Sequence, residues 1–339
     1  MPGYTDWFAL EASPPPSPSV EVAAMSLARV FIQRIALGVV AAWGVLTVMF
    51  ALIGFTRHWN IEAQVGIQQW QGDLSEEEAD AQMEAYLGER GFDRPLYEQY
   101  ADWMWNMFTL DWGESFQTGE PVLPMVVSAT WRTALYVLPA IRIAITIGLL
   151  IGVYAGLHPN SQLASSTVGT SYVLFALPNF YVGGMLLSMS RSGRIPDSAL
   201  LFDHGLPILL TASSLVGGYV SFTRAHAKEY SRADFVRLVT AKGASRLRVA
   251  IHVVRNGAIP LFSMVFTEAL ALLVLAIFVI EVLFGIEGLG LLLFDAIDAR
   301  DLPVLLGGTL VIIAVGVLAN IVQDISYTVL DPRVDTGDR

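Results

Sequence analysis

The chain has 339 residues, of which 54% are hydrophobic and only 15% are charged, and its mean hydropathy is +0.54. Soluble proteins carry about a quarter charged residues. The apolar residues also form runs long enough to cross a hydrocarbon core, which takes about 20 residues of helix. The composition therefore excludes an ordinary soluble domain and predicts an all-α integral membrane protein.

The net charge of −11 comes from one stretch of the chain. Between residues 55 and 130 there are fourteen acidic and three basic residues, which accounts for the whole excess. Lysine occurs only at Lys228 and Lys242, and all other basic residues are arginine. An acidic soluble face with little lysine is typical of a halophile, and a GC-rich genome with one acidic loop is the alternative.

The sequence disfavours thiol and metal chemistry. It contains no cysteine, so it can form neither a disulfide nor a thiolate ligand. The five histidines are scattered over predicted loops and segment ends, with no partner at i,i+4, which does not favour a zinc site.

Six membrane spans are predicted in chain order. They follow a proline-rich N-terminal tail, residues 1–24, which is expected to be disordered; the transmembrane domain occupies residues 25–339. The first apolar run is too long and too far from the N-terminus for a cleaved signal peptide. The predicted spans are Leu27–Phe55, Trp131–Leu157, Leu163–Met189, Gly205–Thr223, Leu261–Phe284 and Leu302–Leu330.

Basic residues set the expected orientation, because Lys and Arg are retained on the cytoplasmic side during insertion. Arg29 and Arg34 place the N-terminus inside, and six spans return the C-terminus to the same side. Residues 224–260 contain eight of the 20 Lys and Arg residues and then form an inner loop. The acidic stretch 55–130 becomes an outer loop.

The outer loop is expected to form a small helical cap. Ser75 and Glu78 have the spacing of a capping box, in which each side chain bonds the backbone N–H of the other residue. Further on, Trp103, Trp105 and Trp112 suit a membrane interface.

The basic inner loop predicts two short helices joined at a glycine. Ser231 and Asp234 have capping-box spacing, Gly243 suits the residue after a helix end, and Ser245 can cap the second helix. The expected apolar faces are Phe235, Leu238 and Val239 on the first helix, and Leu247, Ile251 and Val254 on the second. Such an elbow can bind anionic lipid headgroups or a soluble protein partner.

The residues of this loop resemble a known family. The segments EYSRADFVRLVTAKG and VVRNGAIP resemble the EDYIRTARAKG and ALRNALLP of binding-protein-dependent ABC transporter permeases, in their dipeptide, oligopeptide and nickel branch. GFDRPLYEQY, DWGESF, EVLFGIEGLGLLLFDAIDARDLPV and DPRV also resemble that branch, in order, over about 300 residues. The chain departs from it at Val239-Thr240, at Glu287, and in TEALALLVLA, which stands where the family is glycine-rich.

The resemblance implies a permease subunit of an ATP-driven importer for peptides or related solutes, in the plasma membrane. Its implied partners are a second permease, two ABC ATPase subunits, an extracellular binding protein and membrane lipids, with no nucleic acid. Segment 234–248 would dock an ATPase, with Ala241 and Gly243 as packing and turn positions. The residues carried over for coupling are Glu229, Asp234, Phe235, Arg237, Ala241, Lys242, Gly243 and Arg246.

The chain itself is expected to be non-catalytic and to bind no cofactor. It contains no G-x-x-x-x-G-K-[ST] phosphate loop, so ATP and Mg²⁺ belong on partner ATPases. An ion-coupled secondary transporter is the alternative, but it predicts inverted repeats and paired ionisable groups. A membrane-bound enzyme would need a clustered acid/base or metal set, and the sequence has isolated charges instead.

Three charged residues fall within predicted spans: Arg142, Glu268 and Glu281. A charge that faces lipid costs at least about 2.5 kcal/mol, so these side chains are expected to face protein or a water-filled path. Arg142 and Glu268 either line the translocation path or form an intramembrane ion pair or a contact with the partner permease. Glu281, at the outer end of the fifth span, belongs to the path with a gating role or serves helix-end packing.

Overall fold

The structure is a computed structural model that describes residues 20–56, 65–66, 68–70, 75–89, 93–231, 233–256 and 277–330. These residues are almost entirely helical and contain no strand, only an isolated bridge between Glu114 and Pro121. The labelled helices are α1 (Val20–Thr56), α3 (Glu76–Glu89), α4 (Leu96–Thr109), α5 (Val122–Leu157), α6 (Gln162–Ala176), α7 (Asn179–Arg191), η1 (Leu200–Gly205), α8 (Leu206–Tyr230), α9 (Asp234–Ala241), α10 (Arg246–Asn256), α12 (Leu289–Ala299) and α13 (Leu302–Leu330).

Four helices in the described part are long and apolar enough to cross a membrane, and two bent pairs raise this number to six if each pair is one span. The four are Phe31–Leu52, Val122–Leu157, Leu200–Tyr230 and Leu302–Asp324. They correspond to the predicted first, second, fourth and sixth spans. Helix α1 begins at Val20, so it includes residues 20–24, which the sequence had assigned to the tail.

The predicted third span is not one straight helix. α6 and α7 meet at an angle of 81° across Leu177 and Pro178. Proline has no N–H and disfavours helical geometry at the residue before it, and Leu177 accordingly has φ −71° and ψ 126°. The hydropathy of residues 163–189 is continuous, but Pro178 ends the first half-helix.

The segment after the predicted fifth span turns back sharply. Helix Ile277–Phe284 meets α12 at 84°. Gly285 lies between them with φ +67°, a left-handed conformation that glycine adopts without strain and that commonly ends a helix. Most of the predicted fifth span, including Glu268, lies outside the described residues.

A row of small residues joins α5 to α8. The residues Ala140, Ala144, Gly148, Gly152 and Gly156 recur every fourth position on α5, and all are buried. A Cβ added at Gly152 would lie 2.5 Å from the Cβ of Thr223, so the two backbones are as close as their side chains allow. Small residues at this spacing let membrane helices pack closely, and this pair forms the centre of one core.

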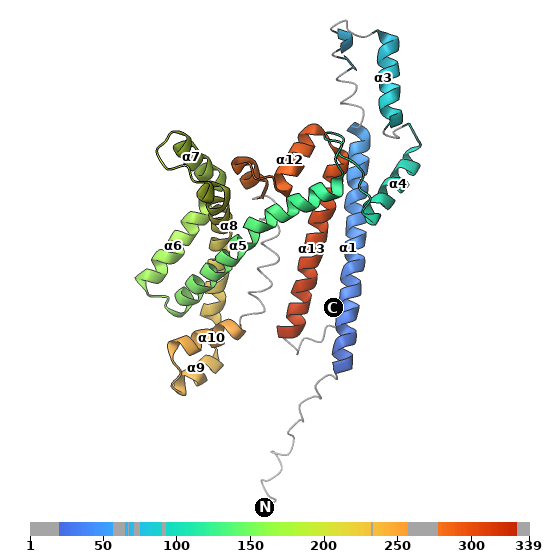
Figure 1. Cartoon of the computed structure of the whole chain (residues 1–339). Helices are drawn as coiled ribbons and strands as arrows, with labels where there is room; N and C mark the ends of the chain where they lie inside the picture. The colour runs from blue at the N-terminus through green and yellow to red at the C-terminus, as the bar shows by residue number, and fades with distance from the viewer. Residues whose placement is uncertain are drawn as a thin grey trace, which may run out of the picture.

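A second core lies where α1, α4, α5, α12 and α13 meet, and α5 connects the two groups (Figure 1). Leu46, Met107 and Trp112 are buried there. Trp112 donates its indole N–H to the carbonyl of Met107 at 3.0 Å. Of the three tryptophans expected at a membrane interface, Trp112 is therefore a core residue, because the loop after α4 folds inward.

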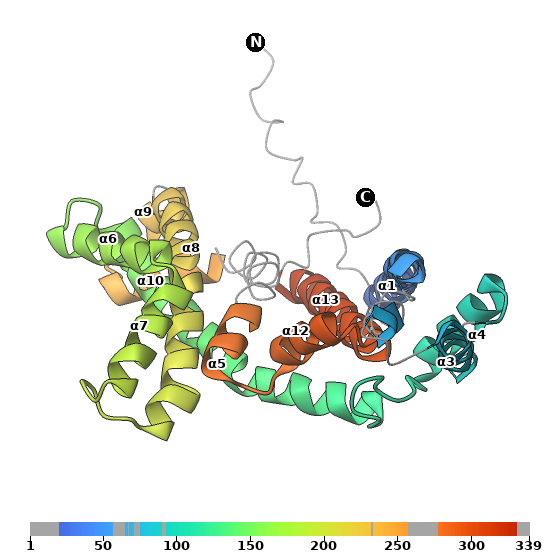
Figure 2. The ribbon, with the colours of Figure 1, turned by 90° about the horizontal axis from the view of Figure 1, so that it is seen from above.

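The first and last helices are neighbours, as two perpendicular views show (Figures 1 and 2). Arg34 near the start of α1 forms an ion pair with Asp324 near the end of α13. A Cβ added at Gly38 would come within 2.6 Å of Val317, so the two helices are also closely packed one turn of α1 beyond this pair. The start of the chain's first helix and the end of its last helix thus lie on the same side.

Candidate functional site

The basic loop forms the elbow that the sequence predicted, with α9 and α10 joined at Gly243. Gly243 has φ +77°. Its amide donates to the carbonyl of Thr240, and the amide of Ala244 donates to the carbonyl of Val239. This is the Schellman arrangement that closes the end of a helix. Ser245 caps α10 by accepting the amide of Arg248 at 3.4 Å. The turn and the second cap are confirmed.

The predicted cap of the first helix was wrong. α9 begins after Ala233, and no side chain caps it. Ser231 instead donates its hydroxyl to the carbonyl of Lys228 at 2.8 Å and ends α8. The reason is that α8 continues to Tyr230, well beyond the predicted end of the fourth span at Thr223. Ser231 therefore lies directly after α8, where the last carbonyls of that helix are free to accept its hydroxyl.

The elbow packs against the C-terminal ends of α5 and α8. Val236 is buried against Val153 and Ala227, and Val249, Ala250 and Val254 pack around them. Of the residues on the predicted apolar faces, Val254 joins this cluster. Val236, which was not assigned to either face, is the buried residue of α9 among the side chains that the structure describes.

Three side chains of the predicted apolar faces are exposed. Leu238 is 57% exposed, Leu247 71% and Ile251 58%. Arg237, Lys242 and Arg248 are also exposed, and Arg237 lies 3.5 Å from Asp234 in an exposed pair. Of the other carried-over residues, Glu229, Ala241 and Gly243 are exposed, while the side chains of Phe235 and Arg246 lie outside the described part. The elbow thus presents apolar and cationic groups together on its free side.

Glu281 is fully buried, and its carboxylate joins three segments. One oxygen accepts the hydroxyls of Thr133 at 2.6 Å and Tyr136 at 3.0 Å, both from α5. The other oxygen accepts the amide of Leu291, in the first turn of α12, at 2.9 Å. A Cβ added at Gly288 would lie only 2.3 Å from this carboxylate. These are the contacts of helix-end packing, one of the two roles left open for Glu281, and a gating role in the translocation path stays a prediction.

Arg142 lies midway along α5 with an exposed side chain. Among the described residues it forms no ion pair, and Glu268, the other predicted charge, lies outside them. The structure therefore places Arg142 where a partner chain, solvent or a residue outside the described part can reach it.

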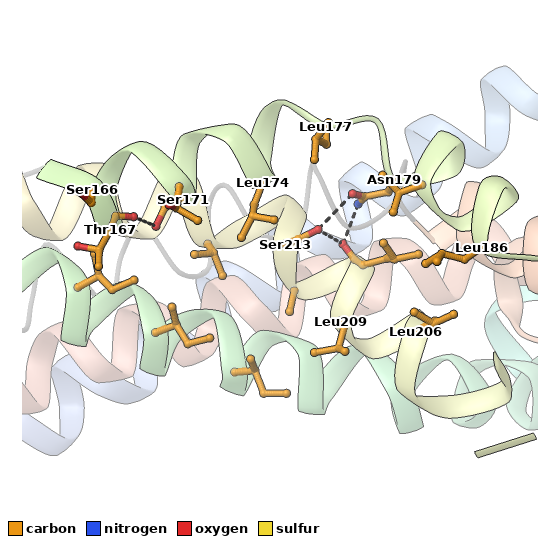
Figure 3. A pocket seen from close by; sticks show the side chains of 18 residues that line it. Ser166, Thr167, Ser171, Leu174, Leu177, Asn179, Leu186, Leu206, Leu209 and Ser213 are labelled. Carbon is orange, nitrogen blue, oxygen red and sulfur yellow. Dashed lines mark hydrogen bonds between the residues drawn. The ribbon is translucent and has the colours of Figure 1, made fainter. Parts of the chain in front are cut away.

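A cavity of about 560 Å³ lies between α5, α6, α7 and α8 (Figure 3). Its wall is mostly Ile, Leu and Val, with hydroxyls from α6. Asn179, at the bend between α6 and α7, donates to the carbonyl of Leu210 at 2.7 Å and accepts the hydroxyl of Ser213 at 3.2 Å. The bend that breaks the third span thus contributes an amide to the cavity wall.

Sequence reasoning missed two structural sites. The first is the small-residue row of α5, which a four-residue period of Ala and Gly could have revealed. The second is Asp301, which is 2% exposed and accepts the hydroxyl of Ser115 and the amide of Gln117. Its other oxygen lies 3.5 Å from the amide of Val304 at the start of α13. No local sequence pattern could predict this contact, because Ser115 and Asp301 are 186 positions apart.

Comparison with known proteins identifies the family. Residues 148–336 match the family described as the inner membrane component of binding-protein-dependent transport systems. A putative peptide permease protein of Brucella ovis is 32% identical over 272 residues, covering 75% of this chain and 84% of its relative. The chain belongs to this family of ABC transporter permeases.

Two further relatives narrow the branch of the family. The oligopeptide transport system permease protein of Bacillus subtilis is 28% identical over 75% of this chain and 85% of its own length. The dipeptide transport system permease protein of Escherichia coli K12 is 28% identical over 73% of this chain and 84% of its own length. The permease is therefore a multi-pass membrane protein of the dipeptide and oligopeptide branch, and its relatives are transport subunits rather than catalysts. Its described residues contain no group of three or more His, Cys, Asp or Glu suited to a metal ion.

Proposed function

We propose that this permease forms the membrane path of an ATP-driven peptide importer together with a second permease, and that its α9–α10 elbow docks a cytoplasmic ATPase. One observation carries the docking role. The elbow is anchored on one side and exposes Leu238, Leu247 and Ile251 on the other. Exposed apolar residues beside cationic groups suit a protein interface whose centre is apolar and whose rim is polar.

The anchoring supports transmission of movement. Val236 packs on Val153 and Ala227, which belong to α5 and α8. These two helices are locked together by the glycine row, so a push on the elbow would move them as one body. Cores are densely packed and transmit displacement rather than absorb it. Closure of an ATPase pair would in this way tilt the α5–α8 core.

The proposed topology has six spans, two of them bent, with both termini in the cytoplasm. The ion pair between Arg34 and Asp324 supports a common side for the two ends. The basic elbow supports that side being the cytoplasm. Two ATPase subunits would bind ATP and Mg²⁺, and an extracellular binding protein would deliver the peptide, as the family's description implies.

Charge reversal and apolar-to-charged variants of the elbow test this function. Leu247→Glu and Arg237→Glu should leave membrane insertion intact but reduce both ATPase co-purification and substrate-stimulated ATP hydrolysis in reconstituted vesicles. Gln162→Glu is the matched control, since it places a new acid on an exposed residue of the same proposed side outside the elbow. Unchanged co-purification and coupling in both elbow variants would overturn the docking role.

The alternative, an ion-coupled secondary transporter, makes the opposite prediction. Uptake would then follow an ion gradient in vesicles that hold this chain without any ATPase. A stable, active preparation of that kind would contradict the importer. An elbow that binds only anionic lipid would respond to lipid charge while ATPase binding stayed constant.

A further inference from the structure

Helix α4 has a buried face and a broad exposed face. The buried face contains Gln99 and Met107, which are 7% and 2% exposed, and Met107 belongs to the second core. The exposed face carries apolar side chains: Tyr97 and Trp105 are each 71% exposed and Phe108 is 42% exposed. The acids Glu98 and Asp102 form one edge of this exposed face, and Trp105, seven positions from Glu98, lies beside them. A helix in water would expose polar residues alone, so the exposed apolar side chains call for another partner.

Contacts with α1 fix the depth of α4. The hydroxyls of Thr47 and Tyr100 lie 2.7 Å apart, and the ring of Phe50 lies 5.4 Å from that of Tyr100 and 5.5 Å from that of Trp103. Thr47 and Phe50 belong to the span Phe31–Leu52. Helix α1 runs on to Thr56, so at 1.5 Å per residue they lie roughly 9–14 Å before its C-terminal end. α4 is therefore beside the membrane boundary rather than above it.

α4 also lies at the periphery of the molecule. Seen from above, α1 separates α4 from α13, and no described helix covers its outer side (Figure 2). We infer that the face formed by Tyr97, Trp105 and Phe108 rests in the headgroup–acyl boundary of the lipid leaflet at the C-terminal end of α1. With the topology proposed above, this is the outer leaflet.

The residue types fit a lipid surface. Tyr and Trp concentrate at membrane interfaces because their rings are apolar and carry one polar group. The polar edge of α4 is acidic, and Asp102 holds Arg94 at 2.7 Å. Amphipathic helices that depend on anionic lipid have basic polar faces, so α4 would bind through apolar burial alone. Its contact should not change with the fraction of anionic lipid or with salt.

The absence of cysteine makes a direct test possible. Tyr97→Cys and Phe108→Cys place a unique thiol on the proposed lipid face. Asp102→Cys is the control, about 120° around the helix from Phe108 at 3.6 residues per turn. Each full-length variant is labelled with bimane and reconstituted, with the subunits that co-purify, in vesicles containing brominated phosphatidylcholine or in plain phosphatidylcholine vesicles with iodide outside.

Bimane at positions 97 and 108 should be quenched more strongly by brominated lipid than by iodide, and bimane at position 102 more strongly by iodide. Added anionic lipid should leave these ratios unchanged. Equal iodide quenching at all three sites would place α4 in water and overturn the inference. Protection of positions 97 and 108 from both quenchers would also overturn it, because a protein partner would then cover this face. Neither outcome bears on ATPase docking by the elbow.

Discussion

The hydroxyl of Thr133 donates to the buried carboxylate of Glu281 at 2.6 Å and accepts the amide of Leu289 at 2.8 Å. Through this single hydroxyl, α5 holds both sides of the bend between helix Ile277–Phe284 and α12. Each donor around the carboxylate is an uncharged group. The bend is therefore fixed by hydrogen-bond geometry rather than by an ion pair.

Replacement of Glu281 should separate geometry from charge. Glu281→Leu leaves the amide of Leu291 and the hydroxyls of Thr133 and Tyr136 without an acceptor, at about 1–3 kcal/mol for each orphaned group. Glu281→Gln keeps an acceptor for the amide, and the two hydroxyls can rotate to accept from its NH₂. Thermal unfolding of the purified permease should show a large drop in melting temperature for Glu281→Leu and a small drop for Glu281→Gln. Equal losses would show that the charge itself is needed.

The glycine row should be sensitive to a single methyl group. Gly152→Ala brings a Cβ to 2.5 Å from that of Thr223 and 3.0 Å from the amide nitrogen of Arg224. Such overpacking costs about 1–3 kcal/mol. The control is Gly169→Ala in α6, where nothing lies within 4 Å and the methyl group should be neutral or stabilising by up to about 1 kcal/mol. Comparable melting temperatures for both variants would refute close α5–α8 packing.

Gly243 offers a test of backbone conformation alone, since an added Cβ there meets open space. Gly243→Val forces a branched residue into φ +77°, at about 1–2 kcal/mol, whereas Gly243→Asn is expected to be better tolerated. The valine variant should lose ATPase co-purification and the asparagine variant should retain it. If both bind ATPase normally, the turn is not required for docking.

The capping box at Ser75 and Glu78, at the start of α3, should weaken in acid. Ser75 donates its backbone amide and hydroxyl to Glu78, and these bonds lower the pKa of that carboxyl below its usual 4.5. Because the folded pKa is depressed, the stabilisation is present above pH 4.5 and is lost as the pH falls through the folded pKa. Hydrogen exchange of residues 75–89, corrected for intrinsic rates, should rise in that window. Glu78→Gln should remove this pH dependence, because it removes the titrating carboxyl, and Glu77→Gln should retain it.

Features governed by neighbouring residues were predictable from the sequence. The capping box at Ser75 and Glu78, the turn at Gly243 and the cap at Ser245 are confirmed, because each depends on residues within three positions. The halophilic character and the carried-over coupling contacts stay predictions.

Features that depend on tertiary position were not predictable. Leu247 and Ile251 have the same hydropathy whether they face α8 or a partner, so periodicity could not distinguish an anchored face from an exposed one. Ser231 could cap either of two helices, and the length of α8 decided which. Pro178 indicates a helix break in the sequence, but the residues on both sides of it are apolar, so summed hydropathy alone predicts a single span.

The pairing of α1 with α13 has a consequence for biosynthesis. Arg34 and Asp324 are separated by 290 positions, so the first helix to leave the ribosome finds its neighbour only when the last has been made. The face of α1 that α13 later covers, which includes Gly38, must meanwhile be shielded by lipid or by a chaperone. Long-range contacts of this kind form late and leave partly assembled chains vulnerable. A protein truncated before α13 should therefore be degraded even though most of its helices have been inserted.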